Sequence, residues 1–365
     1  MAFLDLDRIS VAFKKERVLK EASLQVERGE TVVVFGPSGG GKTVLLRLVS
    51  GVMQPDSGDV RLGGKSLLGA GPEERDVGMA FQNFALYPHM PAYENIASPL
   101  RARGLAESEI ERRVHETARL LKIDHVLKHF PKELSNGQKQ RTALGRALIR
   151  GPEVLLLDDP LRNVDAKLRY EMRIELPRLL KSFGGAVLYV TQDYKEAMAL
   201  GDRVAVLLDG KFLQIDHPAE VYKRPADVRI AKLFGDPTIN LYPVRPRAGR
   251  TGTEIDIFGG TVVLPGTHDH LRDRECLMAL RPEHVHVHTE TIEDGVPMEL
   301  EAVTPLNVRT VLFLKTQDDR ELLATCSEHE QGRFGRGHRA VHAQIDFDRA
   351  LFFDAASGVL LPAAA

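Results

Sequence analysis

The chain has 365 residues, of which 43% are hydrophobic and 27% are charged, a globular composition that excludes wholesale disorder. Its 49 basic and 51 acidic residues give a net charge of −2, which offers no electrostatic reason to expect nucleic acid or anionic lipid as a main partner. No apolar run approaches the roughly 18–20 residues of a membrane span, and Asp5 and Asp7 stand where a signal peptide would be basic. We therefore expect a soluble, intracellular protein of two or three domains.

Residues 1–235 alternate between short apolar runs and stretches of helical period. Four apolar runs are typical of strands buried on both faces, as in a parallel sheet covered by helices, at 31–35, 154–158, 186–191 and 203–208. Between them, 107–121 repeats apolar residues at helical spacing and carries charge on its other face. Alternating runs in the first thirty residues indicate an antiparallel sheet at the entrance. The pattern predicts an α/β domain.

The sequence pattern changes after Phe234-Gly-Asp-Pro. Short alternating runs separated by Gly, Pro, Asn and Asp are predicted strands, at 253–258, 260–265, 276–280, 308–314, 320–325 and 340–347. Several short strands at such spacing are typical of a small all-β barrel or sandwich. The sequence therefore predicts two domains, 1–235 and 236–365.

A glycine-rich loop carries the first chemical signal. Residues 36–43, GPSGGGKT, match G-x-x-x-x-G-K-[ST] between a predicted strand and a predicted helix, which is the context the motif requires. Backbone N–H groups and the helix N-terminus can cradle phosphates, Lys42 can reach the β- and γ-phosphates, and Thr43 can ligate Mg²⁺. The apolar strand ending in Asp158 is the expected partner that holds Mg²⁺. We predict binding of ATP with Mg²⁺, in contact with Ser38, Gly39, Gly40, Gly41, Lys42, Thr43 and Val44.

The pentad LSNGQ at 134–138 decides the family. It lies shortly before the strand at 154–158, and Ser135 can cap the helix that follows. The pentad resembles the LSGGQ signature of ABC-transporter ATPases. The resemblance implies a P-loop NTPase fold with a RecA-like core, an antiparallel β entrance and a helical subdomain. It also implies that Ser135, Gly137 and Gln138 complete the ATP site of a second subunit.

Other segments typical of that family occur along this chain in the same order as in the family. The resemblance implies that Phe13 stacks on adenine, that Gln82 is the Q-loop glutamine contacting Mg²⁺ or water, and that Asp165 belongs to the D-loop. Gln192 lies at the position of the switch histidine. The segments LRPEHV at 280–285 and RALFFDAASGVLL at the end resemble the OB-like (TOBE-type) β domain of carbohydrate-importer ATPases, a regulatory and dimer-contact module.

The resemblance implies a set of partners. The chain would be an importer subunit at the cytoplasmic face of the inner membrane, for a carbohydrate, polyol or related solute. Two transmembrane permease subunits would dock at the groove beside Gln82, with Tyr87, Pro88, His89 and Met90, and an extracytoplasmic solute-binding protein would act indirectly. No nucleic acid is expected.

The departures from the family concern cleavage more than binding. Asp159 stands where a glutamate usually polarises the attacking water, and Gln192 replaces the switch histidine. A misplacement of about 1 Å can cost roughly 10²-fold in rate, so we expect this site to bind MgATP and hydrolyse it slowly through Asp159 and Gln192. Val44 replaces a threonine and Arg162 a D-loop serine at the expected dimer centre. Asn136 replaces a signature glycine, the mildest change because asparagine tolerates left-handed backbone geometry.

These departures leave several arrangements open. The phosphate loop and the strand ending in Asp158 form this chain's own half of an ATP site, here called the Walker half. A weak Walker half with a nearly intact signature predicts pairing with a second, intact ATPase subunit. The alternatives are a homodimeric, fully active importer ATPase and a regulatory subunit whose own hydrolysis is dispensable. A soluble ABC ATPase of DNA repair or translation is disfavoured, because the chain has neither a long coiled coil nor a second cassette.

Two features of the second half have competing interpretations. His284, His286 and His288 alternate with valines, so they could bind a metal from one strand face, but a solvent-facing strand is the favoured interpretation. Cys276 and Cys326 are too few for a disulfide framework and are expected to be packing residues.

Overall fold

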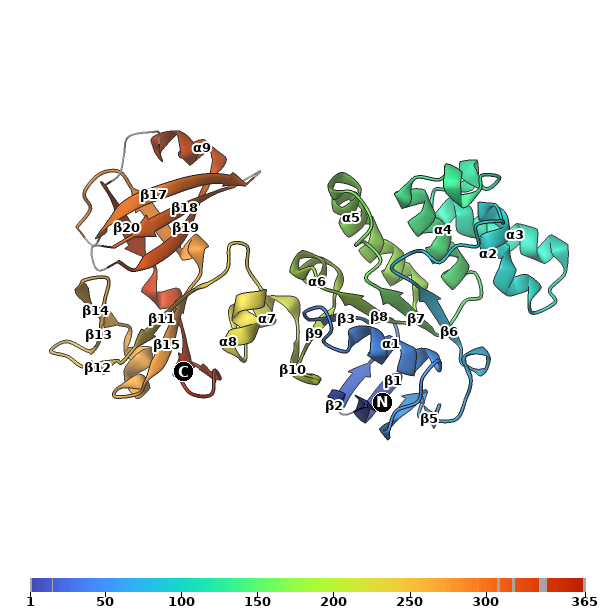
Figure 1. Ribbon diagram of the computed structural model, residues 1–365, viewed down its shortest axis with the longest axis horizontal. Helices are drawn as coiled ribbons and strands as arrows, with labels where there is room; N and C mark the ends of the chain where they lie inside the picture. Colours follow the sequence, from blue (N-terminus) through green and yellow to red (C-terminus); the bar gives the residue numbers. More distant parts are fainter. Residues whose placement is uncertain are drawn as a thin grey trace. The chain divides into compact units, whose positions relative to one another are not determined.

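The computed structural model describes residues 2–14, 16–293, 295–306, 309–316, 319–334 and 340–363, and the chain divides into two compact units, Met1–Val221 and Tyr222–Ala365 (Figure 1). The division lies before the boundary predicted at residue 235. Helix α8 (Val228–Leu233) belongs to the second unit, because the Val228 amide donates to the Gly358 carbonyl at 2.8 Å and Ala231 packs with Ala279 and Phe353.

A six-stranded sheet forms the centre of the first unit. Its strands run in the order β10 (Lys211–Asp216), β9 (Arg203–Leu208), β3 (Thr31–Phe35), β8 (Ala186–Thr191), β7 (Val154–Asp158) and β6 (Val77–Ala80). Every residue of β3 and β8 is buried, and only the edge strand β10 is antiparallel to its neighbour. Three helices that follow central strands are α1 (Lys42–Ser50), α5 (Ala166–Phe183) and α6 (Tyr194–Leu200). The predicted parallel sheet is confirmed.

A four-stranded antiparallel sheet packs on the same core. Its order is β2 (Glu16–Val26), β1 (Leu4–Phe13), β4 (Ser57–Leu62) and β5 (Lys65–Ser66). Leu6 of β1 and Leu24 of β2 belong to one buried cluster with Val32 of the central sheet and Leu45 of α1. The antiparallel entrance predicted from the first thirty residues is thus confirmed, and burial of both sheets against α1 fixes the loop that precedes this helix.

Three helices form a separate part of the first unit (Figure 1): α2 (Ala92–Arg101), α3 (Glu107–Leu120) and α4 (Asn136–Leu148). Helix α3 confirms the helix predicted at 107–121 and buries Ile110, Val114 and Ala118 at helical spacing. Short 3-10 helices lie at Pro72–Glu74, Asp124–Val126, Pro131–Glu133, Gly266–Leu271, Pro282–His284, Gly332–Phe334 and Phe347–Arg349.

A buried arginine fixes the C-terminal end of α1. Arg75 is 2% exposed, and its Nη1 donates to the carbonyls of Leu48 at 2.6 Å and Val49 at 2.9 Å. Its Nη2 donates to Leu67 at 2.7 Å and its Nε to Ala70 at 3.2 Å. A cation at a helix C-terminus also interacts favourably with the macrodipole. Arg75 therefore ties the end of α1 to the segment between β5 and β6.

The second unit is built mainly from antiparallel strands. One sheet runs β11 (Asn240–Val244), β15 (Cys276–Leu280), β21 (Leu351–Asp354), β22 (Leu360–Leu361), and a second runs β12 (Arg247–Ala248), β13 (Thr253–Ile257), β14 (Gly260–Leu264). The third runs β16 (Val285–His288), β20 (Ala340–Ile345), β17 (Val296–Leu306), β18 (Arg309–Lys315), β19 (Glu321–Ser327). Short helices are α7 (Pro218–Lys223), at the junction of the units, α8 and α9 (Glu328–Gln331). The predicted β domain is confirmed.

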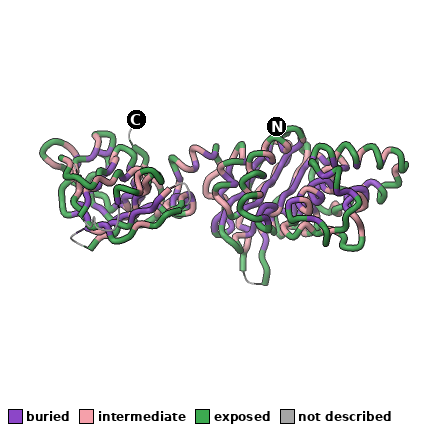
Figure 2. Tube along the Cα trace, turned by 90° about the horizontal axis from the view of Figure 1, so that it is seen from above, coloured by how far each residue is buried: buried purple, intermediate pink, exposed green. Residues whose placement is uncertain are grey.

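Within each unit, the buried residues lie mainly along these sheets (Figure 2).

The three alternating histidines are not all on one strand, because His284 ends a 3-10 turn and β16 begins at Val285. Within the described part of the chain, no three His, Cys, Asp or Glu side chains are grouped as metal ligands. Over the same residues, no helix is long and apolar enough to cross a membrane. Cys276 is buried in the core of the second unit.

Candidate functional site

The glycine-rich loop connects β3 to α1 and cannot be built from larger residues. A Cβ on Gly36 would lie 2.3 Å from the Leu207 carbonyl oxygen, so the backbone passes too close to β9 for a side chain. Gly41 has φ 94°, which favours glycine, and α1 begins at the next residue. The loop therefore directs backbone N–H groups at the start of α1 toward a common centre, where they can bind an anion.

The loop lines a cavity of about 410 Å³, here called the phosphate-loop cavity. Phe13 from β1 lies at this cavity with its side chain 44% exposed, and Gln82, Asp158 and Gln192 reach it from the ends of β6, β7 and β8. The full lining is Phe13, Val18, Ser38, Gly39, Gly41, Lys42, Thr43, Val44, Gln82, Asp158, Asp159, Arg162, Val190 and Gln192. Residues that the sequence predicted separately for phosphate, metal, adenine and cleavage thus meet at one cavity.

Lys42 is the buried cation of the cavity, with 6% exposure. Its Nζ donates to the Gly36 carbonyl at 2.8 Å and to the Pro37 carbonyl at 2.7 Å, so the ammonium group is held inside the loop. Burial lowers the pKa of Lys42, while the carboxylates of Asp159 and Asp158 oppose this shift. The arrangement can present a positive charge to a phosphate group.

The donor set beside Lys42 fits Mg²⁺. The Thr43 hydroxyl donates to Asp158 Oδ1 at 3.3 Å, and Gln82 lines the same cavity. Hydroxyl, carboxylate and amide oxygens are hard ligands, and Mg²⁺ in phosphate sites is held by one or two such groups plus the phosphates. Burial raises the pKa of Asp158, and the hydrogen bond from Thr43 opposes that shift. A cation bound here would stabilise the ionised carboxylate.

Asp159 is held in a constrained position behind Asp158. Its φ is 45°, the residue is only 6% exposed, and its amide donates to the Val190 carbonyl at 2.8 Å. Arg162 Nη1 lies 3.6 Å from Asp159 Oδ2. Burial raises the pKa of Asp159, and the charges of Arg162 and Lys42 oppose the rise. The carboxylate is therefore engaged by a cation of its own chain.

Arg162 has a contact within its own chain that the sequence did not predict. The resemblance places it at the expected dimer centre, which stays a prediction, and in this chain its side chain lines the phosphate-loop cavity. The signal available in the sequence was its spacing of three residues from Asp159, which a tight turn converts into contact. A guanidinium at this point adds a second cation to the cavity beside Lys42.

Glu196 of α6 forms a second feature that the sequence did not reveal. It is 1% exposed, and its Oε2 accepts hydrogen bonds from the hydroxyls of Tyr189 and Thr191, each at 2.8 Å. The Thr191 hydroxyl also lies 3.4 Å from Asp159 Oδ1. Burial raises the pKa of Glu196 to about 7, although both hydroxyl hydrogen bonds oppose the rise. A buried polar chain therefore connects α6 to Asp159.

The signature residues do not line the cavity of their own chain. Ser135 caps α4 as predicted: its Oγ accepts from the Gln138 amide at 3.3 Å, and Gln138 Oε1 accepts from the Ser135 amide at 2.9 Å. Asn136 begins the helix and has no positive φ, so its tolerance of left-handed geometry is not used here. A Cβ on Gly137 would lie 2.5 Å from Leu168 Cδ2, so a larger residue here would require the Leu168 side chain to move.

Two other predicted nucleotide contacts have structural roles in this chain. Asp165 Oδ1 accepts from the Leu168 amide at 2.9 Å and caps α5. Gly40 belongs to the loop, but it does not line the cavity, and its amide donates to the Pro37 carbonyl at 3.3 Å. Contacts of Asp165 and of the signature with nucleotide stay predictions, since they concern a second subunit.

The fold and the cavity together define a phosphate-loop ATPase of the ATP-binding-cassette class. The family model for ABC transporters matches residues 19–162. The chain is 28% identical to the ATP-binding cassette MJ0796, solved as a dimer in a post-hydrolysis state with ADP and Pi, with a TM-score of 0.53 over 59% of this chain and 98% of that one.

Relatives of greater length extend the comparison. The sn-glycerol-3-phosphate import ATP-binding protein UgpC of Escherichia coli O6:K15:H31 is 42% identical over 305 residues, which are 83% of this chain and 85% of that protein. UgpC of E. coli K12 and of Shigella sonnei Ss046 are each 41% identical over the same shares. The chain belongs to the ATP-binding subunits of ABC transporters, and it is an ABC-type ATPase coupled to transport.

Proposed function

We propose that this chain is the ATP-binding subunit of an importer for glycerol 3-phosphate or a related polyol or carbohydrate. The observation that carries the proposal is the length of the similarity to import ATP-binding proteins: 305 aligned residues exceed the 221 of the first unit, so the likeness extends into the β unit. A cassette alone is shared by transporters of many kinds, whereas a shared second unit narrows the comparison to this branch.

The docking surface for permease subunits is proposed at the segment after Gln82. Asn95 holds this segment from both sides, since its Oδ1 accepts from the Tyr87 amide at 2.7 Å and its Nδ2 donates to the Met90 carbonyl at 2.8 Å. The guanidinium carbon of Arg146 lies 5.3 Å from the centroid of the Tyr87 ring, and Tyr87 is still 45% exposed. A rigid, exposed aromatic segment suits contact with a protein partner. The chain would work there as a peripheral subunit at the cytoplasmic face.

Reconstitution tests the solute. The chain is assembled with its permease subunits in proteoliposomes, and ATP-dependent uptake of labelled sn-glycerol 3-phosphate is compared with that of maltose. We expect uptake of the phosphorylated polyol and loss of uptake in Lys42→Ala. Uptake of maltose alone would overturn the preference for the phosphorylated polyol and leave the transport role intact.

We further propose that this chain's own Walker site binds MgATP and hydrolyses it slowly. Thr43 and Asp158 provide oxygen ligands for the ion, which would neutralise phosphate charge when bound. Asp159, one methylene shorter than the usual glutamate, is drawn toward Arg162, and Gln192 at the cavity has no titratable proton. These features weaken the polarisation of an attacking water.

A weak Walker half favours pairing with a different, intact ATPase subunit, whose site the signature of this chain would complete. In such a pair, Ser135→Arg should abolish turnover, because the bulky side chain blocks the intact site. Asp159→Asn should cost much less, because it affects only the weak site. Mass analysis of the assembled transporter identifies both ATPase subunits. Two copies of this chain with full-speed transport would refute the pairing and favour the homodimer.

A further inference from the structure

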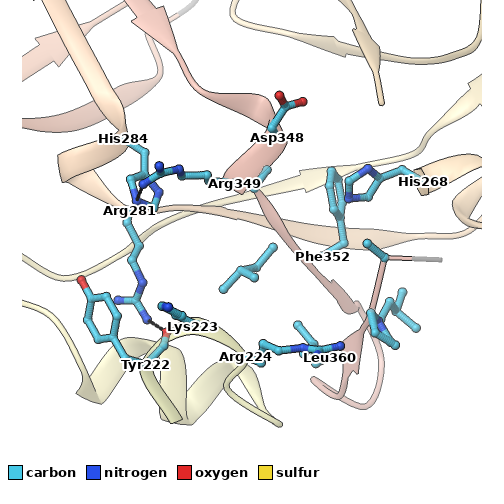
Figure 3. Close-up of a pocket in the computed structure, with 15 residues that line it drawn as sticks. Tyr222, Lys223, Arg224, His268, Arg281, His284, Asp348, Arg349, Phe352 and Leu360 are labelled. Carbon is cyan, nitrogen blue, oxygen red and sulfur yellow. Dashed lines mark hydrogen bonds between the residues drawn. The ribbon is translucent and has the colours of Figure 1, made fainter. Parts of the chain in front are cut away.

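The second unit contains a cavity of about 620 Å³, here called the basic cavity. Small-molecule sites commonly have volumes of about 300–1,000 Å³. All of its lining residues lie between 222 and 363, so it belongs to this unit alone. The walls come from the C-terminal end of α7 and the residue after it, from the 3-10 turns that precede β16 and β21, and from β21 and β22 (Figure 3). It is remote in sequence from the phosphate loop.

Positive charges outnumber negative charges among the residues that line the cavity. Lys223, Arg224, Arg281 and Arg349 contribute cations, and Asp348 is the carboxylate among the lining residues. In Figure 3 the carboxylate of Asp348 points away from the other labelled side chains. The whole chain has a net charge of −2, so this concentration of positive charge does not reflect an overall basic composition. Such a wall attracts anions.

One of these cations is buried and held in place, and a second is exposed and paired with a carboxylate. Arg281 is 4% exposed, donates to the Phe234 carbonyl at 2.6 Å and lies 3.6 Å from the centroid of the Tyr222 ring. The Arg349 side chain is 65% exposed, and its Nε lies 3.2 Å from Asp346 Oδ2 in an ion pair. The fixed guanidinium of Arg281 loses less rotamer freedom when an anion binds near it, which reduces the entropic cost of binding.

Part of the cavity wall is apolar. Leu351, Phe352 and Leu360 line it, and the ring of His268 lies 5.0 Å from that of Phe352. Burial lowers the pKa of both His268 and His284, so the neutral imidazoles add no charge near pH 7. The cavity therefore combines a cationic side with an apolar side.

We propose that the basic cavity binds a phosphomonoester that carries an apolar or ring-shaped body. The dianion faces Lys223 and Arg349, and the body lies against Leu351, Phe352 and Leu360. A dianion matches the excess of positive charge better than a carboxylate does, and arginine guanidinium groups bind phosphate oxygens in bidentate fashion. The proposal does not depend on which solute is transported.

Isothermal titration calorimetry of the full chain, saturated with ADP so that the phosphate loop is filled, tests this site. Phenyl phosphate is the probe, inorganic phosphate lacks the body, and benzyl alcohol lacks the charge. We expect phenyl phosphate to bind about tenfold or more tightly than either comparison ligand. Absence of phenyl phosphate binding overturns the proposal, and equal binding of inorganic phosphate overturns the role of the apolar wall.

Variants locate the binding. Lys223→Gln and Arg349→Gln should each weaken phenyl phosphate about tenfold, and Lys223→Glu should weaken it further because it adds a repelling carboxylate. Arg245→Gln, an exposed arginine of the same unit outside the cavity, is the matched control and should leave affinity unchanged. Arg281 is left intact because it holds backbone carbonyls. Equal affinity in all variants would refute the assignment to this cavity.

Discussion

Replacing Glu196 with glutamine should change how the stability of this protein depends on pH. The side chain is 1% exposed, and burial raises its pKa from 4.5 to about 7. The unfolded chain releases this proton at lower pH than the folded chain does. The unfolded state therefore binds fewer protons over that interval, and the free energy of unfolding falls as the pH rises from about 4.5 to about 7.

The size of the effect follows from the shift. Each pKa unit corresponds to about 1.4 kcal/mol, so the full loss across the interval is about 3 kcal/mol. Glutamine cannot titrate, and its carbonyl oxygen can still accept from Tyr189 and Thr191. We therefore expect Glu196→Gln to lack this loss. Between about pH 5 and about pH 8, the free energy of unfolding of the variant should rise by about 2 kcal/mol relative to that of the wild type.

Urea denaturation of the full chain at the two pH values measures this difference. Glu171→Gln is the control, because Glu171 is an exposed glutamate on α5. The control should follow the wild type at both pH values. If Glu196→Gln also follows the wild type across the interval, then Glu196 is ionised in the folded protein throughout, and the argument from burial is wrong.

Three further changes test the cassette. Lys42→Ala should weaken a fluorescent ATP analogue about tenfold or more in equilibrium titrations, since a charge-assisted contact contributes roughly 1.5–3 kcal/mol; unchanged affinity would contradict the phosphate-loop assignment. Asp159→Glu combined with Gln192→His should accelerate single-turnover hydrolysis, and a wild-type rate already near 10 s⁻¹, about the typical enzyme value, would refute the slow-site proposal. Arg75→Met should lower the free energy of unfolding by about 3 kcal/mol or more in urea, because buried carbonyls lose their donors, and a loss below about 1 kcal/mol would show that water replaces them.

Local patterns were sufficient for the central sheet and for the phosphate loop. The strands at 31–35, 154–158 and 186–191 begin and end where the mainly apolar runs do, because a strand buried on both faces favours apolar residues along its whole length. The loop motif predicted most of the loop residues that line the cavity, Gly40 excepted, because its geometry is set by glycines adjacent in sequence. Thr43 and Asp158 meet because parallel strands end at one edge of the sheet.

Tertiary contacts explain what the sequence did not predict. Arg162 turns back onto Asp159 within a four-residue turn, which the comparison with a serine in the family did not suggest. Glu196 looks like an ordinary residue of an amphipathic helix, and it is buried because α6 packs against α5, β3 and β8. The boundary predicted at 235 marks a change of composition, whereas α8 is held by Gly358 far along the chain.

The position of Lys42 has a consequence for reversibility. Its ammonium group donates two of its three hydrogens to the carbonyls of Gly36 and Pro37, so one donor remains for an arriving phosphate. Binding can therefore add a charge-assisted contact while both backbone contacts are kept. When the product leaves, Lys42 still has its two carbonyl partners and does not become an unsatisfied buried charge. The empty site is thus stable with its lysine in place, as repeated cycles of binding and release require.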